Sequence, residues 1–179
     1  MRIFLLICIA YITSCSVLFS VPHKYDSVLE RALPKKPEWK LKGRINQKEL
    51  LAAQAFGFDT NCIYVQETIY STKDNNEKLK YKFLRFWGDG HAMYKNPVLD
   101  HFPNRADADN FSWTTPGYYT IQGDIISIEV FGYSGMGWGY GKEQFRIINS
   151  RLLCGDNCLQ HATPFEKHCI GSLTSIPDW

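Results

Sequence analysis

After Cys62 the chain alternates between hydrophobic and polar positions. Residues 63–70 and 79–83 both follow this alternation, and a polar turn at residues 73–78 separates them. A strand with one buried face has a period of two, because successive side chains point to opposite faces of a sheet. The two segments therefore predict a pair of neighbouring antiparallel strands.

Tight-turn signals and further alternating segments extend this pattern. Asp89-Gly90 favours a hairpin, since this dipeptide readily adopts the positive φ values that hairpin loops need. Further strands are expected at residues 92–95, 117–121, 125–131 and 143–150, with one more around 163–167. Six to eight short strands of this kind predict a mainly β fold, an antiparallel meander that forms a small barrel or a curved sheet.

One short helix is predicted ahead of the strands, over about residues 47–56. Asn46 and Glu49 have the order of a capping box, and Gly57 stands where a left-handed C-terminal cap belongs. The side chains expected to pack against the sheet are Leu50, Leu51 and Phe56.

Two segments lack clear periodicity. Residues 96–115 contain two prolines and three aspartates, and we interpret them as a long loop. Residues 132–141 interleave glycines with aromatic residues. The segment is either a long hairpin whose rings fold back over the barrel mouth or a loop that presents its rings to a ligand. The candidate ligand-binding residues are Tyr133, Met136, Trp138 and Tyr140.

The N-terminal segment, residues 1–20, has the features of a secretion signal. A positive Met1-Arg2 precedes about ten apolar residues, too few to span a bilayer, which needs about 20. The run Ile12-Thr13-Ser14-Cys15 resembles the lipobox of bacterial lipoproteins, which implies cleavage before Cys15 and acylation of its thiol and new amine. An ordinary cleaved signal and an uncleaved signal anchor are the alternatives. Residues 21–45, with a Pro-Lys-Lys-Pro stretch, are predicted to be a tether.

Four cysteines follow the signal: Cys62, Cys154, Cys158 and Cys169. An even number of cysteines in an exported chain indicates two disulfides, because the compartment is oxidising. Three pairings are open, and we favour Cys154–Cys158 as a local link and Cys62–Cys169 as a long-range one.

Composition narrows the class of protein. The 179 residues suit one β domain, expected at 46–179 with the cysteines in its C-terminal tail, and the 15% aromatic content favours strands. A net charge of +2 gives no reason to expect nucleic acid as a partner.

Two passages resemble a known family. Residues 82–90 (KFLRFWGDG) and 117–129 (GYYTIQGDIISIE) are similar to consecutive hairpins of small bacterial lipocalin-like domains. Such domains are often carried on lipoproteins, which agrees with the lipobox-like sequence. The resemblance implies a β-barrel and no catalytic residues, because the family shares none.

Other residues suggest metal or catalytic chemistry, but each has a simpler explanation. The cysteines near His161 and His168 suggest zinc, but disulfides are favoured in an oxidising compartment, and three residues between Cys154 and Cys158 do not match a thioredoxin-type redox pair. For hydrolysis, His91 and His101 are the candidate bases, yet no nucleophile motif accompanies them. We expect no cofactor, no metal and no catalytic residue.

The sequence therefore predicts a non-catalytic lipoprotein of the bacterial cell envelope, tethered to the outer membrane facing the periplasm or the surface. It would be a binding or structural module whose partner is a small apolar ligand or an envelope protein. A small hydrolase using the 96–115 segment, or an accessory subunit of an envelope complex, are the alternatives.

Overall fold

The computed structural model describes residues 20–71, 77–95, 99–134, 137–155 and 163–179. The fold is mainly β, with an eight-stranded antiparallel sheet, a separate two-stranded hairpin and few helices. The main sheet contains β3 (Ile63–Ser71), β4 (Glu77–Phe86), β5 (His91–Lys95), β6 (Thr114–Gln122), β7 (Ile125–Ser134), β8 (Gly137–Ile148), β9 (Arg151–Cys154) and β10 (Glu166–His168).

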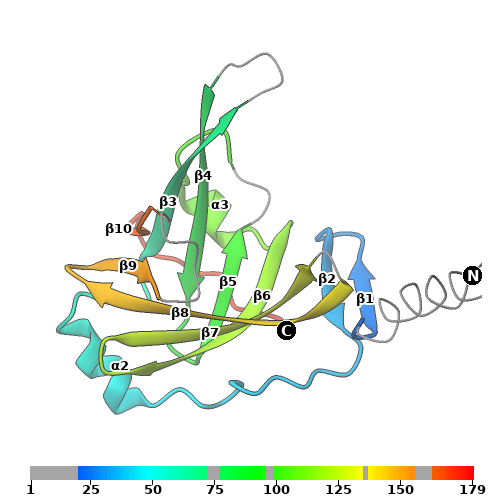
Figure 1. Ribbon diagram of the computed structural model, residues 1–179, viewed down its shortest axis with the longest axis horizontal. Coiled ribbons are helices and arrows are strands. Elements are labelled where there is room, and N and C mark those ends of the chain that lie inside the picture. The colour runs from blue at the N-terminus through cyan, green and yellow to red at the C-terminus, as the bar shows by residue number, and fades with distance from the viewer. Residues whose placement is uncertain (1–19, 72–76, 96–98, 135–136, 156–162) are drawn as a thin grey trace, which may run out of the picture.

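The sheet curls into a nearly closed barrel (Figure 1). Strands adjacent in sequence pair from β3 to β9, and β10 returns to pair with β3. Phe165, just before β10, exchanges two backbone hydrogen bonds of 2.9 Å with Leu152 of β9. The two edges of the sheet meet there, which protects them from pairing with another chain. The predicted antiparallel meander is confirmed.

Short turns set the register between strands. At the β4–β5 turn the Trp87 amide donates to the His91 carbonyl over 2.9 Å, and Gly90 has a φ of 96°. At the β6–β7 turn Gly123 has a φ of 61°. Both glycines adopt the left-handed conformation, which the sequence predicted at Asp89-Gly90.

Aromatic side chains fill the barrel interior. The Phe86 ring centroid lies 5.1 Å from that of Phe58, 5.6 Å from Tyr64 and 4.9 Å from Tyr119. All four residues are almost completely buried. The interior is thus a packed core, as in other small barrels.

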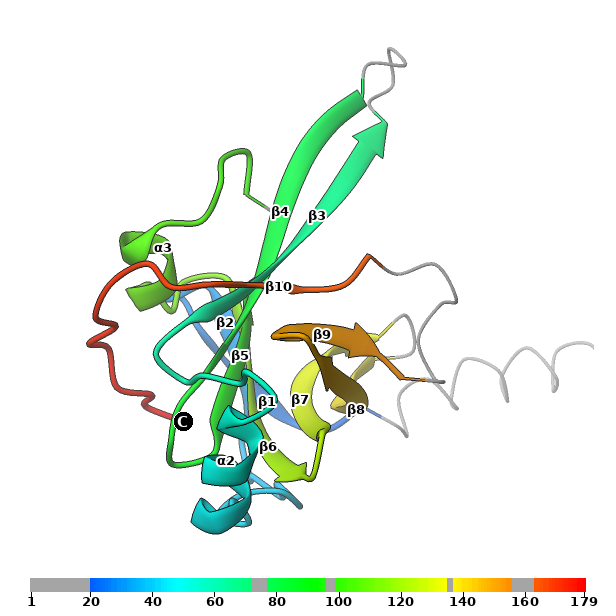
Figure 2. The same ribbon diagram turned by 90° about the vertical axis from the view of Figure 1, so that its left-hand side faces the viewer.

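The outer face of β3, β4 and β5 is buried as well. Ile63, Phe83 and Met93 point away from the barrel interior, yet each is inaccessible to solvent. Helix α3 (Arg105–Asp109) and the C-terminal residues 169–179 cover them (Figure 2). Among the residues described, no helix combines the length and apolar character needed to cross a membrane.

Helix α2 (Gln47–Gln54) lies where the sequence predicted a helix. The Asn46 side chain caps it by accepting from the Lys48 amide over 3.0 Å. Gly57, at a φ of 89°, ends it, because its amide donates to Gln54 and the next amide to Ala53. The expected packing is correct only for Leu50; Leu51 is 63% exposed and Phe56 is 46% exposed.

The predicted tether, residues 21–45, contains a folded hairpin. Strands β1 (His23–Asp26) and β2 (Arg31–Pro34) pair with each other, and the β2 residues are buried. Residues 35–45 then run along the sheet to α2 (Figure 1), where the Glu129 carboxylate accepts from the Lys40 and Leu41 amides. Much of the expected spacer is therefore part of the packed domain.

The predicted long loop at residues 96–115 is more structured than expected. Leu99 exchanges backbone hydrogen bonds with Tyr81 of β4, and α3 starts with an Asn104/Asp107 capping box. The described part of this segment covers one area of the outer face of the sheet and does not run beside it as a long strand. This explains why its hydrophobic residues lack a period of two.

The described parts of the glycine-rich segment, residues 132–134 and 137–141, belong to the β7–β8 hairpin, in which Tyr133 pairs with Trp138 and Phe131 with Tyr140. Gly132, Gly137, Gly139 and Gly141 therefore lie in paired strands, and the hairpin interpretation describes this backbone correctly.

Candidate functional site

A pocket of about 430 Å³ lies between the β1–β2 hairpin and strands β6, β7 and β8. Its volume is within the range of small-molecule sites, about 300–1,000 Å³. It is lined by Tyr25, Glu30, Arg31, Ala32, Trp113, Thr114, Thr115, Phe131, Gly132, Tyr133 and Trp138. Three of its aromatic residues remain largely exposed: Tyr25 at 57%, Trp113 at 48% and Tyr133 at 66%. Large exposed rings around a hollow are typical of binding surfaces.

The hairpin that forms one wall is fixed locally and across the sheet. The Asp26 carboxylate accepts from the Val28 and Leu29 amides over 3.0 and 3.1 Å, which closes the turn. The Leu29 carbonyl accepts from the Trp113 amide over 2.9 Å. This last bond joins the hairpin to the start of β6, so the two walls are held together.

Trp113 has an unusual backbone conformation for a bulky residue. Its φ is 58°, in the left-handed region that costs an L-residue about 1–2 kcal/mol. Such strain persists only where the surroundings impose it, and it often marks a functional position. Here the strained residue presents a half-exposed indole to the pocket.

The β7–β8 hairpin supplies the opposite wall. The Trp138 ring stacks on Phe131 with centroids 5.9 Å apart, meets Tyr133 edge-on at 5.8 Å and lies 4.7 Å from the His23 ring. Trp138 is thus held by neighbouring rings, whereas the Tyr133 side chain is largely exposed to solvent.

The predicted ligand-binding residues do not all line this pocket. Tyr133 and Trp138 line the pocket. Tyr140 instead packs against Trp39 at 4.9 Å, and its hydroxyl accepts from the Glu38 amide over 2.8 Å. Burial raises the pKa of the Tyr140 hydroxyl. Met136 lies outside the described residues.

Arg31 is a pocket residue that the sequence analysis did not identify. Its side chain is completely buried, pairs with Asp178, and lies over the rings of Trp179 at 5.2 Å and Phe111 at 5.8 Å. Among the described residues its Nε and Nη1 have no hydrogen-bond partner. An isolated arginine in an expected spacer gave no signal of this role.

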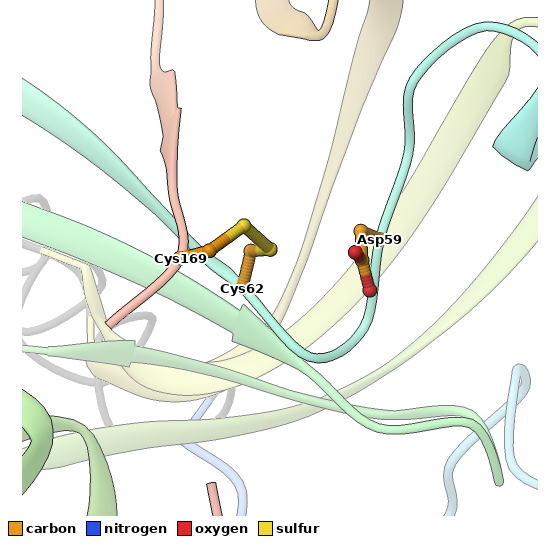
Figure 3. A group of neighbouring side chains, drawn as sticks. All are labelled: Asp59, Cys62 and Cys169. Carbon is orange, nitrogen blue, oxygen red and sulfur yellow. A yellow bond between two sulfur atoms is a disulfide. The ribbon is translucent and has the colours of Figure 1, made fainter. Parts of the chain in front are cut away.

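The structure contains the expected long-range disulfide, Cys62–Cys169, across 107 residues. Figure 3 shows Asp59 beside it, with the Asp59 oxygen and the two sulfurs all within 4.8 Å of one another. Because these sulfurs are bonded to each other, they offer no thiolate to a metal. Cys154 is also disulfide-bonded, while Cys158, its expected partner, and His161 lie outside the described residues, as does Cys15.

The candidate catalytic histidines have structural neighbours. His91 Nδ1 lies 2.9 Å from an Asp89 oxygen, and its Nε2 lies 3.2 Å from the Trp179 carbonyl. His101 Nε2 lies 3.1 Å from an oxygen of Asp107, the capping residue of α3. In the described part of the chain neither histidine forms a hydrogen bond with a serine hydroxyl or a thiol.

Comparisons with known proteins add no identification. No protein-family model matches the chain, and neither a curated protein nor a solved structure is significantly similar to it. The resemblance to lipocalin-like domains therefore stays a prediction.

Proposed function

We propose that this protein is a non-catalytic, exported binding module that holds a small ligand with apolar or aromatic surface in the pocket beside β1 and β2. The observation that carries the proposal is the convergence of Tyr25, Trp113 and Tyr133, three largely exposed rings from separate segments, on one hollow. The packed barrel interior leaves this outer pocket as the better candidate for a ligand.

The left-handed Trp113 supports the proposal independently. Glycine adopts such a φ without a Cβ penalty, whereas a bulky residue there is strained. A strained residue that presents its ring to the pocket is a candidate for contact with a ligand.

Binding can be tested by ligand-observed NMR with a mixed set of neutral aliphatic, aromatic, anionic and amine-bearing fragments. We expect some fragments to bind the wild type and to lose about tenfold in affinity in Trp113→Gly and Tyr133→Ala. Trp113→Gly should retain its free energy of unfolding or gain about 1 kcal/mol, since the backbone strain is relieved.

Tyr70→Ala is the matched control. Tyr70 is 45% exposed on the outer part of the β3–β4 hairpin and does not line the pocket. Its replacement should leave fragment binding unchanged. Fragments that bind the wild type and both pocket variants equally well, or no binding by any fragment, would contradict the proposed function.

Export and lipid anchorage are part of the same proposal. The Cys62–Cys169 disulfide supports an oxidising compartment, where such bonds persist. Acylation of Cys15 would attach the module to a bacterial membrane, and two chains are needed for stable anchoring. Palmitate labelling in a bacterial host should mark the wild type and not Cys15→Ala; equal labelling of both would remove the anchor from the proposal.

A further inference from the structure

Among the residues described, the pocket has two charged side chains, one exposed and one buried. Glu30 lines it, is exposed, and makes no ion pair or hydrogen bond within the described ranges of the chain. Arg31 is the other ionised residue there, but its side chain is completely buried and pairs with Asp178. The charge that a ligand can approach is therefore the carboxylate of Glu30.

The aromatic rings that line the pocket with Glu30 also favour a positively charged ligand. The face of an aromatic ring carries negative potential and attracts cations within about 6 Å of its centroid. Tyr25, Trp113, Tyr133 and Trp138 come from β1, from the residue before β6, from β7 and from β8, so separate segments contribute rings to the hollow.

Other ligand classes fit less well. The Thr114 hydroxyl already donates to the Phe111 carbonyl over 2.7 Å, and Thr115 also has an interaction within the protein. The two threonine side chains are therefore already engaged within the protein. An anion would meet the Glu30 carboxylate, and the charge of Arg31 is already paired with Asp178.

We propose that the pocket binds an organic cation, a quaternary or alkylated ammonium group, with Glu30 as counter-ion and the surrounding rings as its cage. This inference rests on the proposed function, since it names the ligand class of the same pocket. The group could belong to a free molecule or to a lipid headgroup, because both present the same chemistry.

The test compares choline with 3,3-dimethylbutan-1-ol, its uncharged isostere, by isothermal titration of the purified full chain. We expect choline to bind about tenfold more tightly, which corresponds to the cation–π contribution of a desolvated site. Glu30→Gln should weaken choline about five- to tenfold and leave the isostere unchanged, because the variant removes charge and keeps shape.

Lys24→Gln is the control variant, because it also replaces one charged residue of the same hairpin with glutamine. Lys24 is exposed and does not line the pocket, so its replacement should not weaken choline. Equal affinity for choline and its isostere, both lost in Trp113→Gly, would overturn the cation inference while leaving the proposed pocket intact. No binding of choline to a protein that binds other fragments would overturn it as well.

Flotation with phosphatidylcholine and phosphatidylglycerol vesicles separates the two sources. Binding to phosphatidylcholine vesicles that is lost in Glu30→Gln would assign the cation to a lipid headgroup. Binding of free choline without vesicle binding would assign it to a soluble ligand. Either result supports a cation site. Preferential binding to phosphatidylglycerol vesicles over phosphatidylcholine vesicles would contradict it.

Discussion

Asp109 holds the C-terminal segment against the outer face of the sheet. Its carboxylate accepts from the amide and hydroxyl of Ser175, from Thr174, and from the buried Arg85 guanidinium over 2.7 Å. Burial alone would raise the pKa of this carboxyl, but the hydrogen bonds from Ser175, Arg85 and Thr174 outweigh it and hold the pKa well below its ordinary value. One ionised residue thus fixes two segments that are far apart in sequence.

This arrangement predicts acid sensitivity. Because the pKa of Asp109 is lower in the folded chain, its stabilisation is complete above the unfolded pKa of about 3.9 and is lost as the pH falls from there toward the folded value. The free energy of unfolding should therefore fall more steeply from about pH 5 to about pH 2.5 in the wild type than in Asp109→Asn. Urea denaturation across this range measures both slopes.

At pH 7 the same variant should lose about 3 kcal/mol, because it leaves Arg85 buried without its counter-charge. Asp124→Asn is the control, since Asp124 forms a largely exposed pair with Arg146 at 3.5 Å and should change stability by less than about 1 kcal/mol. Equal losses in the two variants would show that Asp109 has no special role.

At the scale of elements, helix α2 shows how orientation is decided. Leu50 and Leu51 are adjacent and chemically identical, yet Leu50 is 7% exposed and Leu51 is 63% exposed. The sequence favours both equally for packing. The direction of the chain leaving Asn46 and the Gly57 cap determine which one meets the core.

Truncating each leucine tests this orientation. Leu50→Ala should destabilise the protein by about 2–3 kcal/mol, because it removes buried methyl groups and leaves a cavity. Leu51→Ala should cost less than about 0.5 kcal/mol, since alanine suits an exposed helix position. Thermal unfolding of both variants distinguishes the predicted order from its reverse, which would place Leu51 in the core.

At the scale of the whole molecule, the Cys62–Cys169 disulfide joins the first strand of the sheet to the segment that covers its outer face. The bond spans 107 residues, so it restricts the unfolded chain strongly. In the chain-entropy treatment a loop of this length contributes about 4–5 kcal/mol.

Replacing both cysteines should lower the unfolding free energy by about 4 kcal/mol. Amide exchange should rise first in residues 169–179, because non-covalent contacts such as those of Asp109 and Arg31 then retain them without the covalent link. Non-reducing peptide mapping checks the pairing in the wild type. A double variant, Cys62→Ala with Cys169→Ala, that is as stable as the wild type would contradict this account.

Sequence reasoning succeeded where neighbouring residues decide the outcome. The Asp89-Gly90 and Gly123 turns, the Asn46 cap and the alternating strands depend on backbone conformation and side-chain period within a few residues. Tyr133 and Trp138, which line the pocket, were named as candidates because an aromatic run with glycines is unusual in itself.

The pocket was predicted only in part, because its walls come from distant segments. Glu30 and Arg31 lie in a stretch rich in proline and lysine that has the composition of a spacer. Trp113 follows a segment without period, and its positive φ leaves no mark in the sequence. They meet through contacts between distant segments, such as the backbone bond from Trp113 to Leu29 and the ring contact between His23 and Trp138.

The amino-acid sequence by itself thus determined the strand-rich fold, its turns, its short helix and two of the rings now proposed for binding, because these follow from local chemistry. Only the tertiary structure decided that the barrel interior is full, that the expected spacer forms a pocket wall, and that Glu30 is the charge a ligand can approach. The physical reason is that burial and charge compensation are set by residues such as Asp178 and Phe58, which meet their partners only when the sheet has closed.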